Sequence, residues 1–277
     1  MLPFTPFTAP EHQDFLLPGG RPAALLVHGY PGTLYEVRPL ADGLNERGWT
    51  CRGLLLPGFG FQLETLPQRA WTEWLDAVMD ALASLRRDHA PVLLAGHSLG
   101  GALALSAAAR FPPLDGLVLL APFWRNRGPL WALLPVLKYL IPRVKPFKMM
   151  KTEMDDPRLR KEMQEFLPEL DFDDPQTQQT LREFVVPVGM FDELRKAGAA
   201  GYRSAPDVTC PTLVIQGADD TTVRLEDTRR LAGRLAGAVT RLEVRAAHEL
   251  PFAASPSFPE VRESVLAFAE TVRRSGL

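Results

Sequence analysis

The chain has 277 residues, of which 46% are hydrophobic and 23% are charged, and its formal net charge is −2. This composition is typical of a globular protein, and the lack of a basic excess argues against nucleic acid as a partner. No apolar run reaches the roughly 20 residues needed to span a bilayer, and no signal peptide is expected. Cys51 and Cys210 each begin an apolar run, so we expect buried thiols, a reducing compartment and a cytoplasmic location.

Short apolar runs alternate with helical patterns through most of the chain. An edge strand is expected at residues 15–17, ahead of the first buried strand. Buried strands are expected at 23–27, 51–56, 91–95, 117–120, 212–216 and 240–244, and helices at 34–48, 72–88, 102–110, 225–235 and 260–274. This alternation predicts an α/β protein with a mostly parallel sheet that helices cover on both faces. In such sheets ligands bind at the carboxyl ends of the strands.

The alternation of strands and helices stops between residues 123 and 206, where helical pieces are separated by prolines. We therefore predict a core formed by residues 1–122 and 207–277, with residues 123–206 inserted as a helical cap, or lid. Because the insertion leaves the core after one strand and rejoins it before another, it is expected to cover the carboxyl edge of the sheet.

A serine lies between a buried strand and a helix, in the stretch from Gly96 to Gly100. Strand, Gly-x-Ser-x-Gly and helix in this order predict the nucleophile elbow of an α/β-hydrolase fold, with Ser98 on a strained turn of positive φ. The glycines stand where a Cβ would collide with the neighbouring strand or helix. The alternative is a glycine-rich turn that carries an incidental serine.

A serine hydroxyl needs a general base to act as a nucleophile at neutral pH. His248 follows the last expected strand, and of the five histidines it is the one whose loop can reach back over the elbow. We expect His12 and His89 on the surface, and His28 in a structural role that shapes the loop after the first buried strand. His97 is adjacent to Ser98, but neighbouring side chains on such a turn point in different directions.

The base in turn needs a carboxylate that fixes its tautomer and stabilises the imidazolium. Asp219 and Asp220 follow the strand expected at 212–216. The order serine, acid, histidine along the chain is that of α/β-hydrolases. On the residues alone, either aspartate can be the orienting acid.

Four sequence blocks occur in the order HGYPGT, GHSLGG, IQGADDTTV and AAHELP. Over residues 23–122 and 207–274 the chain resembles bacterial carboxylesterases and monoacylglycerol lipases, and the resemblance is weaker in the insertion. It implies that the acid lies three residues after the glycine of a Gly-x-x-Asp-x-x-Val block. Gly217, Asp220 and Val223 have this spacing, so Asp220 is favoured over Asp219, which is interpreted as a loop acid.

Acyl transfer also needs donors for the tetrahedral oxyanion. The residue after the nucleophile supplies one backbone N–H group, here that of Leu99. By similarity to the family's His-Gly-x-x-Gly block, the second comes from Tyr30, since Pro31 has no N–H group. The alternative is that His28 to Gly32 form only a tight turn.

These residues predict a serine hydrolase of carboxylic esters that acts through an acyl-enzyme on Ser98 and needs no cofactor. No metal site is expected, since no Cys/His cluster has ligand spacing, and the expected partner is a small acyl ester. Trp131, Leu134 and Leu137 are interpreted as lining an acyl pocket or, alternatively, as the lid's own small core. Thioesterase, amidase or perhydrolase activity on the same triad stays open, as does a non-catalytic binding protein, and the sequence indicates no particular oligomeric state.

Overall fold

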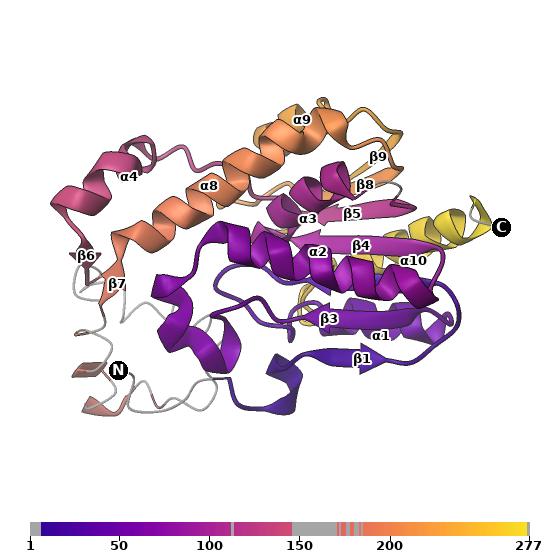
Figure 1. The fold of residues 1–277 in the computed structure, drawn as a ribbon, viewed down its shortest axis with the longest axis horizontal. Helices are drawn as coiled ribbons and strands as arrows, with labels where there is room; N and C mark the ends of the chain where they lie inside the picture. The colour runs from indigo at the N-terminus through magenta and orange to yellow at the C-terminus, as the bar shows by residue number, and fades with distance from the viewer. Residues whose placement is uncertain are drawn as a thin grey trace.

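A seven-stranded sheet runs through the middle of the molecule in the order β1-β3-β2-β4-β5-β8-β9 (Figure 1). The structure is a computed structural model, and it describes residues 7–111, 114–145, 171, 173–175, 178–179, 183 and 185–275. The strands of the sheet are β1 (Phe15–Leu17), β2 (Ala23–Val27), β3 (Thr50–Leu54), β4 (Val92–His97), β5 (Gly116–Leu120), β8 (Thr212–Gly217) and β9 (Val239–Val244).

The sheet is parallel except at one edge, where β1 pairs antiparallel with β3. Its inner strands β2, β4, β5 and β8 are buried along their whole length. Burial on both faces explains why these strands are continuous apolar runs rather than alternating ones. The predicted mostly parallel sheet, with its short edge strand at residues 15–17, is confirmed.

Helices cover both faces of the sheet. α2, α3 and α8 pack against one another on one face, while α1 and α10 contact each other on the opposite face (Figure 1). The described residues form the helices α1 (Arg38–Glu46), α2 (Trp71–Asp88), α3 (Leu99–Arg110), α4 (Pro129–Leu140), α8 (Val188–Ser204), α9 (Leu225–Ala232) and α10 (Phe258–Ser275), with 3-10 turns η1 (Pro10–His12), η2 (Gly60–Gln68) and η3 (Ala205–Asp207). Within the described parts of the chain, no helix is both long and apolar enough to cross a bilayer.

Two helices, α1 and α3, begin three or more residues away from the start that the sequence pattern predicts. α1 starts at Arg38, because residues 33–37 form turns in which Glu36 N–H donates to Thr33 O and Val37 N–H to Leu34 O. α3 starts at Leu99, directly after the serine, rather than at residue 102.

The predicted insertion contributes α4, a two-stranded antiparallel sheet of β6 (Arg143–Val144) and β7 (Val186–Pro187), and α8. Residues 146–170 lie outside the described part of the chain. α8 packs directly on α3, since Gly201 lies against the backbone of Ala102. This helix therefore shares the layer of α2 and α3.

One histidine does not lie where the sequence analysis expects it. His12 is buried rather than on the surface, and its Nδ1 is 2.7 Å from Oγ1 of Thr33. The rings of Phe7 and Tyr35 pack against its imidazole. These long-range contacts give no signal in the local sequence, which is irregular around His12.

A buried carboxylate joins the start of the insertion to α9. Asp227 is 3% exposed, and Nε of Arg125 and Nε of Arg127 each donate to it at 3.0 Å. Indole Nε1 of Trp124 donates to the Asp227 carbonyl at the same distance. Burial alone raises the pKa of Asp227, but the hydrogen bonds from the two guanidinium groups outweigh it and hold the pKa below its ordinary value.

We expect Asp227→Asn to lower the free energy of unfolding by about 2 kcal/mol at pH 7, measured by urea denaturation. Breaking a buried ion pair costs about 3–5 kcal/mol, and the guanidinium groups here are 31% and 35% exposed, which reduces the effect. Since the folded pKa is depressed, this stabilisation is fully present above 3.8 and is lost as the pH falls through the folded value.

The matched control is Glu226→Gln, one residue away, because the Glu226 side chain is 72% exposed and its ion pair with Arg127 lies at the surface. Exposed pairs contribute about 0–1 kcal/mol. Equal losses in the two variants would contradict a structural role for the buried carboxylate.

Candidate active site

Ser98 occupies a strained turn between β4 and α3. Its φ is 51° and its ψ is −111°, a conformation that L-residues rarely adopt. Its N–H group donates to Leu120 O at 2.9 Å, and its carbonyl accepts from Phe123 N at 3.0 Å and Ala102 N at 3.2 Å. The turn that the Gly-x-Ser-x-Gly pattern predicts is therefore present, held by the end of β5.

The glycines on either side of Ser98 permit this turn because neighbouring backbone can approach them closely. A Cβ on Gly96 would overlap the backbone of Gly100, and a Cβ on Gly100 would overlap the carbonyl of Val27 in β2. Backbone from two strands and a helix thus converges on Ser98, which is 5% exposed.

The loop after β2 lies against the elbow. A Cβ built on Gly29 would be 3.1 Å from the Ser98 Cβ, so the neighbouring Tyr30 is close to the serine in space. His28 shapes this loop, since its Nε2 accepts from Leu56 N at 3.1 Å and its Nδ1 is 2.8 Å from Gly29 O. Burial lowers the pKa of His28, so its ring is neutral with the proton on Nδ1.

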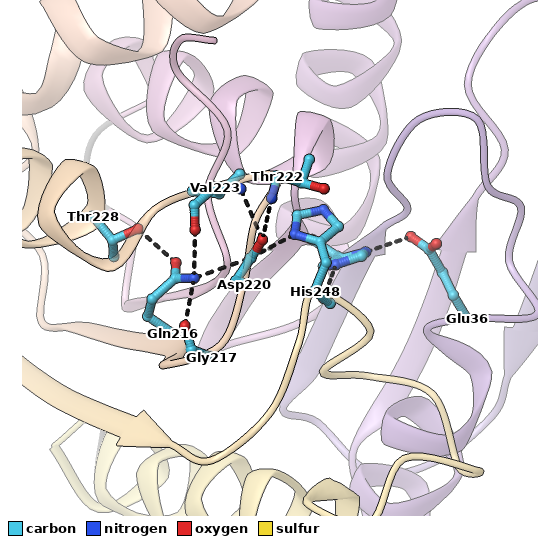
Figure 2. Close-up of polar contacts among 9 residues, drawn as sticks. Glu36, Gln216, Gly217, Asp220, Thr222, Val223, Thr228 and His248 are labelled. Atoms are coloured by element: carbon cyan, nitrogen blue, oxygen red, sulfur yellow. Dashed lines mark hydrogen bonds and ion pairs between the residues drawn. The ribbon is translucent and has the colours of Figure 1, made fainter. Parts of the chain in front are cut away.

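Asp220 and His248 are in direct contact at the carboxyl edge of the sheet (Figure 2). Nδ1 of His248 is 2.7 Å from Oδ2 of Asp220. Oδ1 of Asp220 accepts from the backbone N–H groups of Thr222 and Val223, both at 2.8 Å. The neighbouring Asp219 is exposed, and its backbone N–H donates to Ala246 O at 3.0 Å. Of the two candidate acids, the one that contacts the histidine is Asp220.

Gln216 supports Asp220 and was not identified from the sequence. It is 1% exposed, its Nε2 donates to Asp220 Oδ2 at 3.0 Å, and its Oε1 accepts from Thr228 Oγ1 at 2.6 Å. The sequence signal that could have identified Gln216 is its position as a polar residue near the end of an otherwise apolar strand. Burial alone raises the pKa of Asp220, but hydrogen bonds from His248, Val223 and Gln216 outweigh it and hold the pKa below its ordinary value. Asp220 is therefore a carboxylate that can stabilise an imidazolium.

Helix α4 presents two different faces. Leu134 is buried and Trp131 and Leu137 are half-buried, whereas Leu133, Tyr139 and Leu140 are exposed. The ring of Trp131 packs edge-on against Phe123 at 5.6 Å between centroids. Because Phe123 N–H donates to Ser98 O, Phe123 links the inner face of α4 to the elbow. Sequence analysis had not identified Phe123 as a site residue.

Comparison with known protein families identifies the family to which this sequence belongs. The sequence profile of the family described as serine aminopeptidase, S33, matches residues 20–252. The chain belongs to this family.

Among the described residues, no group of three or more His, Cys, Asp or Glu side chains is arranged to hold a metal ion.

Two relatives of this S33 family protein match part of the chain. The chain is 30% identical over 106 residues to a thermostable monoacylglycerol lipase of Bacillus sp. strain H-257, and the matched segment covers 38% of this chain and 42% of the lipase. It is 35% identical over 107 residues to a carboxylesterase of Bacillus subtilis strain 168, and the matched segment covers 38% of this chain and 43% of the carboxylesterase. The chain thus matches less than half the length of these relatives, and both have the names that the sequence resemblance predicts.

Solved structures share the fold over nearly the whole length. A chain from work on LipS and LipT, two metagenome-derived lipolytic enzymes, has a TM-score of 0.75 at 21% identity and covers 95% of this chain and 98% of its own. A Paleococcus ferrophilus monoacylglycerol lipase has a TM-score of 0.67 at 18% identity, with 94% and 98% covered. The predicted α/β-hydrolase fold is confirmed.

Proposed function

We propose that this S33 family protein is a serine hydrolase that cleaves carboxylic esters through an acyl-enzyme on Ser98. The observation that carries the proposal is the 2.7 Å contact between His248 and Asp220 at the sheet edge where the strained Ser98 turn lies. The partial similarity to a monoacylglycerol lipase and a carboxylesterase supports an ester as the substrate.

In the proposed mechanism, His248 Nε2 removes the proton from the Ser98 hydroxyl as its oxygen attacks the ester carbonyl. Asp220, ionised and bonded to Nδ1, leaves Nε2 as the basic nitrogen and stabilises the imidazolium that forms. The imidazolium then protonates the leaving alcohol. Water, activated by the same nitrogen, releases the acid and restores the serine.

Stabilisation of the oxyanion is assigned to hydrogen bonds from the backbone N–H groups of Tyr30 and Leu99. Leu99 begins α3, so its N–H group is among those without a partner inside the helix, and the positive end of the helix dipole favours negative charge there. The packing of Gly29 against the Ser98 Cβ supports the assignment of Tyr30, the next residue of that loop.

We further propose that residues 123–206 form a cap over the site and that Trp131, Leu134 and Leu137 line an acyl pocket. The contact of Trp131 with Phe123 supports this assignment.

A cytoplasmic location is also proposed, supported by two buried, unpaired thiols, Cys51 and Cys210.

Amide hydrolysis is the second candidate, because the family description names an aminopeptidase. Thioester hydrolysis and perhydrolysis can use the same triad. Specificity constants for p-nitrophenyl butyrate, butyryl-thiocholine and aminoacyl p-nitroanilides, compared on one preparation, separate ester, thioester and amide hydrolysis. A larger constant for the anilides than for the ester would replace the esterase proposal with the amidase one.

Ser98→Ala is expected to abolish hydrolysis of p-nitrophenyl esters, because removing the nucleophile of a triad costs on the order of a million-fold in turnover. The variant is expected to keep its fold, which circular dichroism and urea denaturation check. If purified Ser98→Ala retains more than about 1% of wild-type turnover, the nucleophile is another group.

Asp220→Asn is expected to lower kcat by roughly ten-thousand-fold, because the amide no longer holds His248 in the tautomer that accepts the serine proton. Asp219→Asn is the matched control, since Asp219 is the adjacent exposed acid, and it should cost far less. Similar kcat values for the two variants would contradict the assignment of Asp220 as the orienting acid.

Leu137→Ala is expected to lower the ratio of octanoate to acetate ester hydrolysis and to leave acetate hydrolysis nearly unchanged. Each methylene removed from water contributes about 0.8 kcal/mol, or roughly fourfold in the specificity constant. Tyr139→Ala, on the outer face of the same helix with 77% exposure, should leave the ratio unchanged. A ratio that responds equally to both substitutions, or to neither, argues against α4 as the wall of the acyl pocket.

A further inference from the structure

A second buried pair of charged groups lies beside the candidate triad and has no role in the mechanism above. Glu36 and His97 are each 3% exposed. Nδ1 of His97 is 3.0 Å from Oε1 of Glu36, and its Nε2 is 3.1 Å from the backbone carbonyl of His248. In Figure 2, Glu36 lies on the side of His248 opposite to Asp220.

The partners of His97 determine how many protons its ring carries. A peptide carbonyl only accepts hydrogen bonds, so Nε2 must be the donor to His248 O. Oε1 of Glu36 also accepts from the backbone N–H of Gly29, as a carboxylate does. With acceptors at both ring nitrogens, both contacts are made only when His97 is an imidazolium.

The groups that face His97 are consistent with this charge. The His248 ring is 5.0 Å away between centroids and Asp220 lies beyond it, while His28 is buried and neutral. Burial alone lowers the pKa of His97, but Glu36, helped by Asp220, outweighs it and raises the pKa above 6.5. Burial likewise raises the pKa of Glu36, and His97 outweighs it, so the pKa of Glu36 is held below its ordinary value.

One carboxylate therefore connects three segments of the candidate site. Glu36 holds the Gly29 N–H in the loop that carries Tyr30, and His97 in the elbow. Through His97 it holds the His248 carbonyl, which also accepts from Leu250 N at 2.9 Å. Space for this carboxylate requires a glycine at position 32, where a Cβ would overlap the Glu36 carboxyl group.

We propose that the ionised Glu36–His97 pair is a positioning device that holds the His248 loop over Ser98, and that loss of its shared proton releases this loop. The inference rests on the proposed function for its catalytic consequence. When the pH rises through the raised pKa of His97, one ring nitrogen becomes an acceptor that faces another acceptor. The remaining proton stays on Nδ1, because the Glu36 carboxylate is a stronger acceptor than a peptide carbonyl. Nε2 then faces the His248 carbonyl without a proton, this contact is lost, and kcat falls.

The charge state of His97 is tested by ¹⁵N NMR of histidine-labelled protein titrated with base. The His97 signals are those that disappear in the Glu36→Gln/His97→Gln double variant. Both ring nitrogens of His97 are expected to keep protonated-type shifts through pH 6.5, with a titration midpoint above that value. A midpoint at or below 6.5 overturns the proposal. The titration is repeated on Ser98→Ala, so its outcome does not depend on esterase activity.

The positioning role is tested by two double variants that remove the ion pair without leaving a buried carboxylate. The amide nitrogen of glutamine reaches the place of histidine Nε2, whereas that of asparagine reaches only the place of Nδ1. Glu36→Gln/His97→Gln therefore keeps a donor to the His248 carbonyl, and Glu36→Gln/His97→Asn does not. We expect kcat about ten- to a hundredfold lower in the asparagine variant than in the glutamine variant, with KM similar in both.

The pH profile provides the second kinetic test. Wild-type kcat is expected to fall with the midpoint that NMR gives for His97, and this fall is expected to be absent from the glutamine double variant. Equal kcat values for the two double variants, or a wild-type kcat that stays constant through the NMR midpoint, overturn the positioning role. Failure of the proposed function has a different signature, because Ser98→Ala would then remain active.

Discussion

The backbone turn at Ser98 is the constraint on which the rest of the site depends. A residue with φ of 51° outside glycine is strained, and such strain persists only where the surroundings fix it. Here β5 fixes it through Leu120 O, the segment after β5 through Phe123 N, and α3 through Ala102 N. The close approach of Val27 at Gly100 then sets the distance between β2 and α3.

The parallel sheet determines what can gather around that turn. Because the ends of β2, β4, β8 and β9 share one edge, four loops far apart in sequence bring Tyr30, Ser98, Asp220 and His248 to one place. Each of these loops is tied to a neighbour by buried polar contacts, with Gln216 behind Asp220 and Glu36 behind Gly29. Two carboxylates, Asp220 and Glu36, thus lie one on each side of His248, and both raise the pKa of His97.

Local patterns were sufficient to predict the elbow and the alternation of strands and helices. Ser98 follows from strand, glycine spacing and helix, whereas the choice of Asp220 over Asp219 came from the resemblance to carboxylesterases and monoacylglycerol lipases, whose acid lies three residues after a glycine, here Gly217. Glu36 was missed because it falls inside a pattern that reads as helix from residue 34, while its side chain turns inward to Gly29 and His97.

Other misses have the same physical origin. Gln216 contacts the loop and helix that follow its own strand, Phe123 contacts Ser98, and the burial of His12 depends on Thr33 and Tyr35. Periodicity reports which face of an element is apolar, but not which polar group in another loop satisfies a buried side chain. Such contacts become visible only when the topology is known.

The central claim is that Ser98 is the nucleophile and that His248 and Asp220 activate it. Reaction with a fluorophosphonate, followed by proteolysis and mass spectrometry of the peptide around Gly96 to Gly101, tests it most directly. We expect one equivalent of phosphonate on Ser98, with labelling strongly slowed in Asp220→Asn. Two results would contradict the account. One is a phosphonate on another residue, and the other is protein that stays unlabelled after prolonged exposure to the probe and still hydrolyses esters.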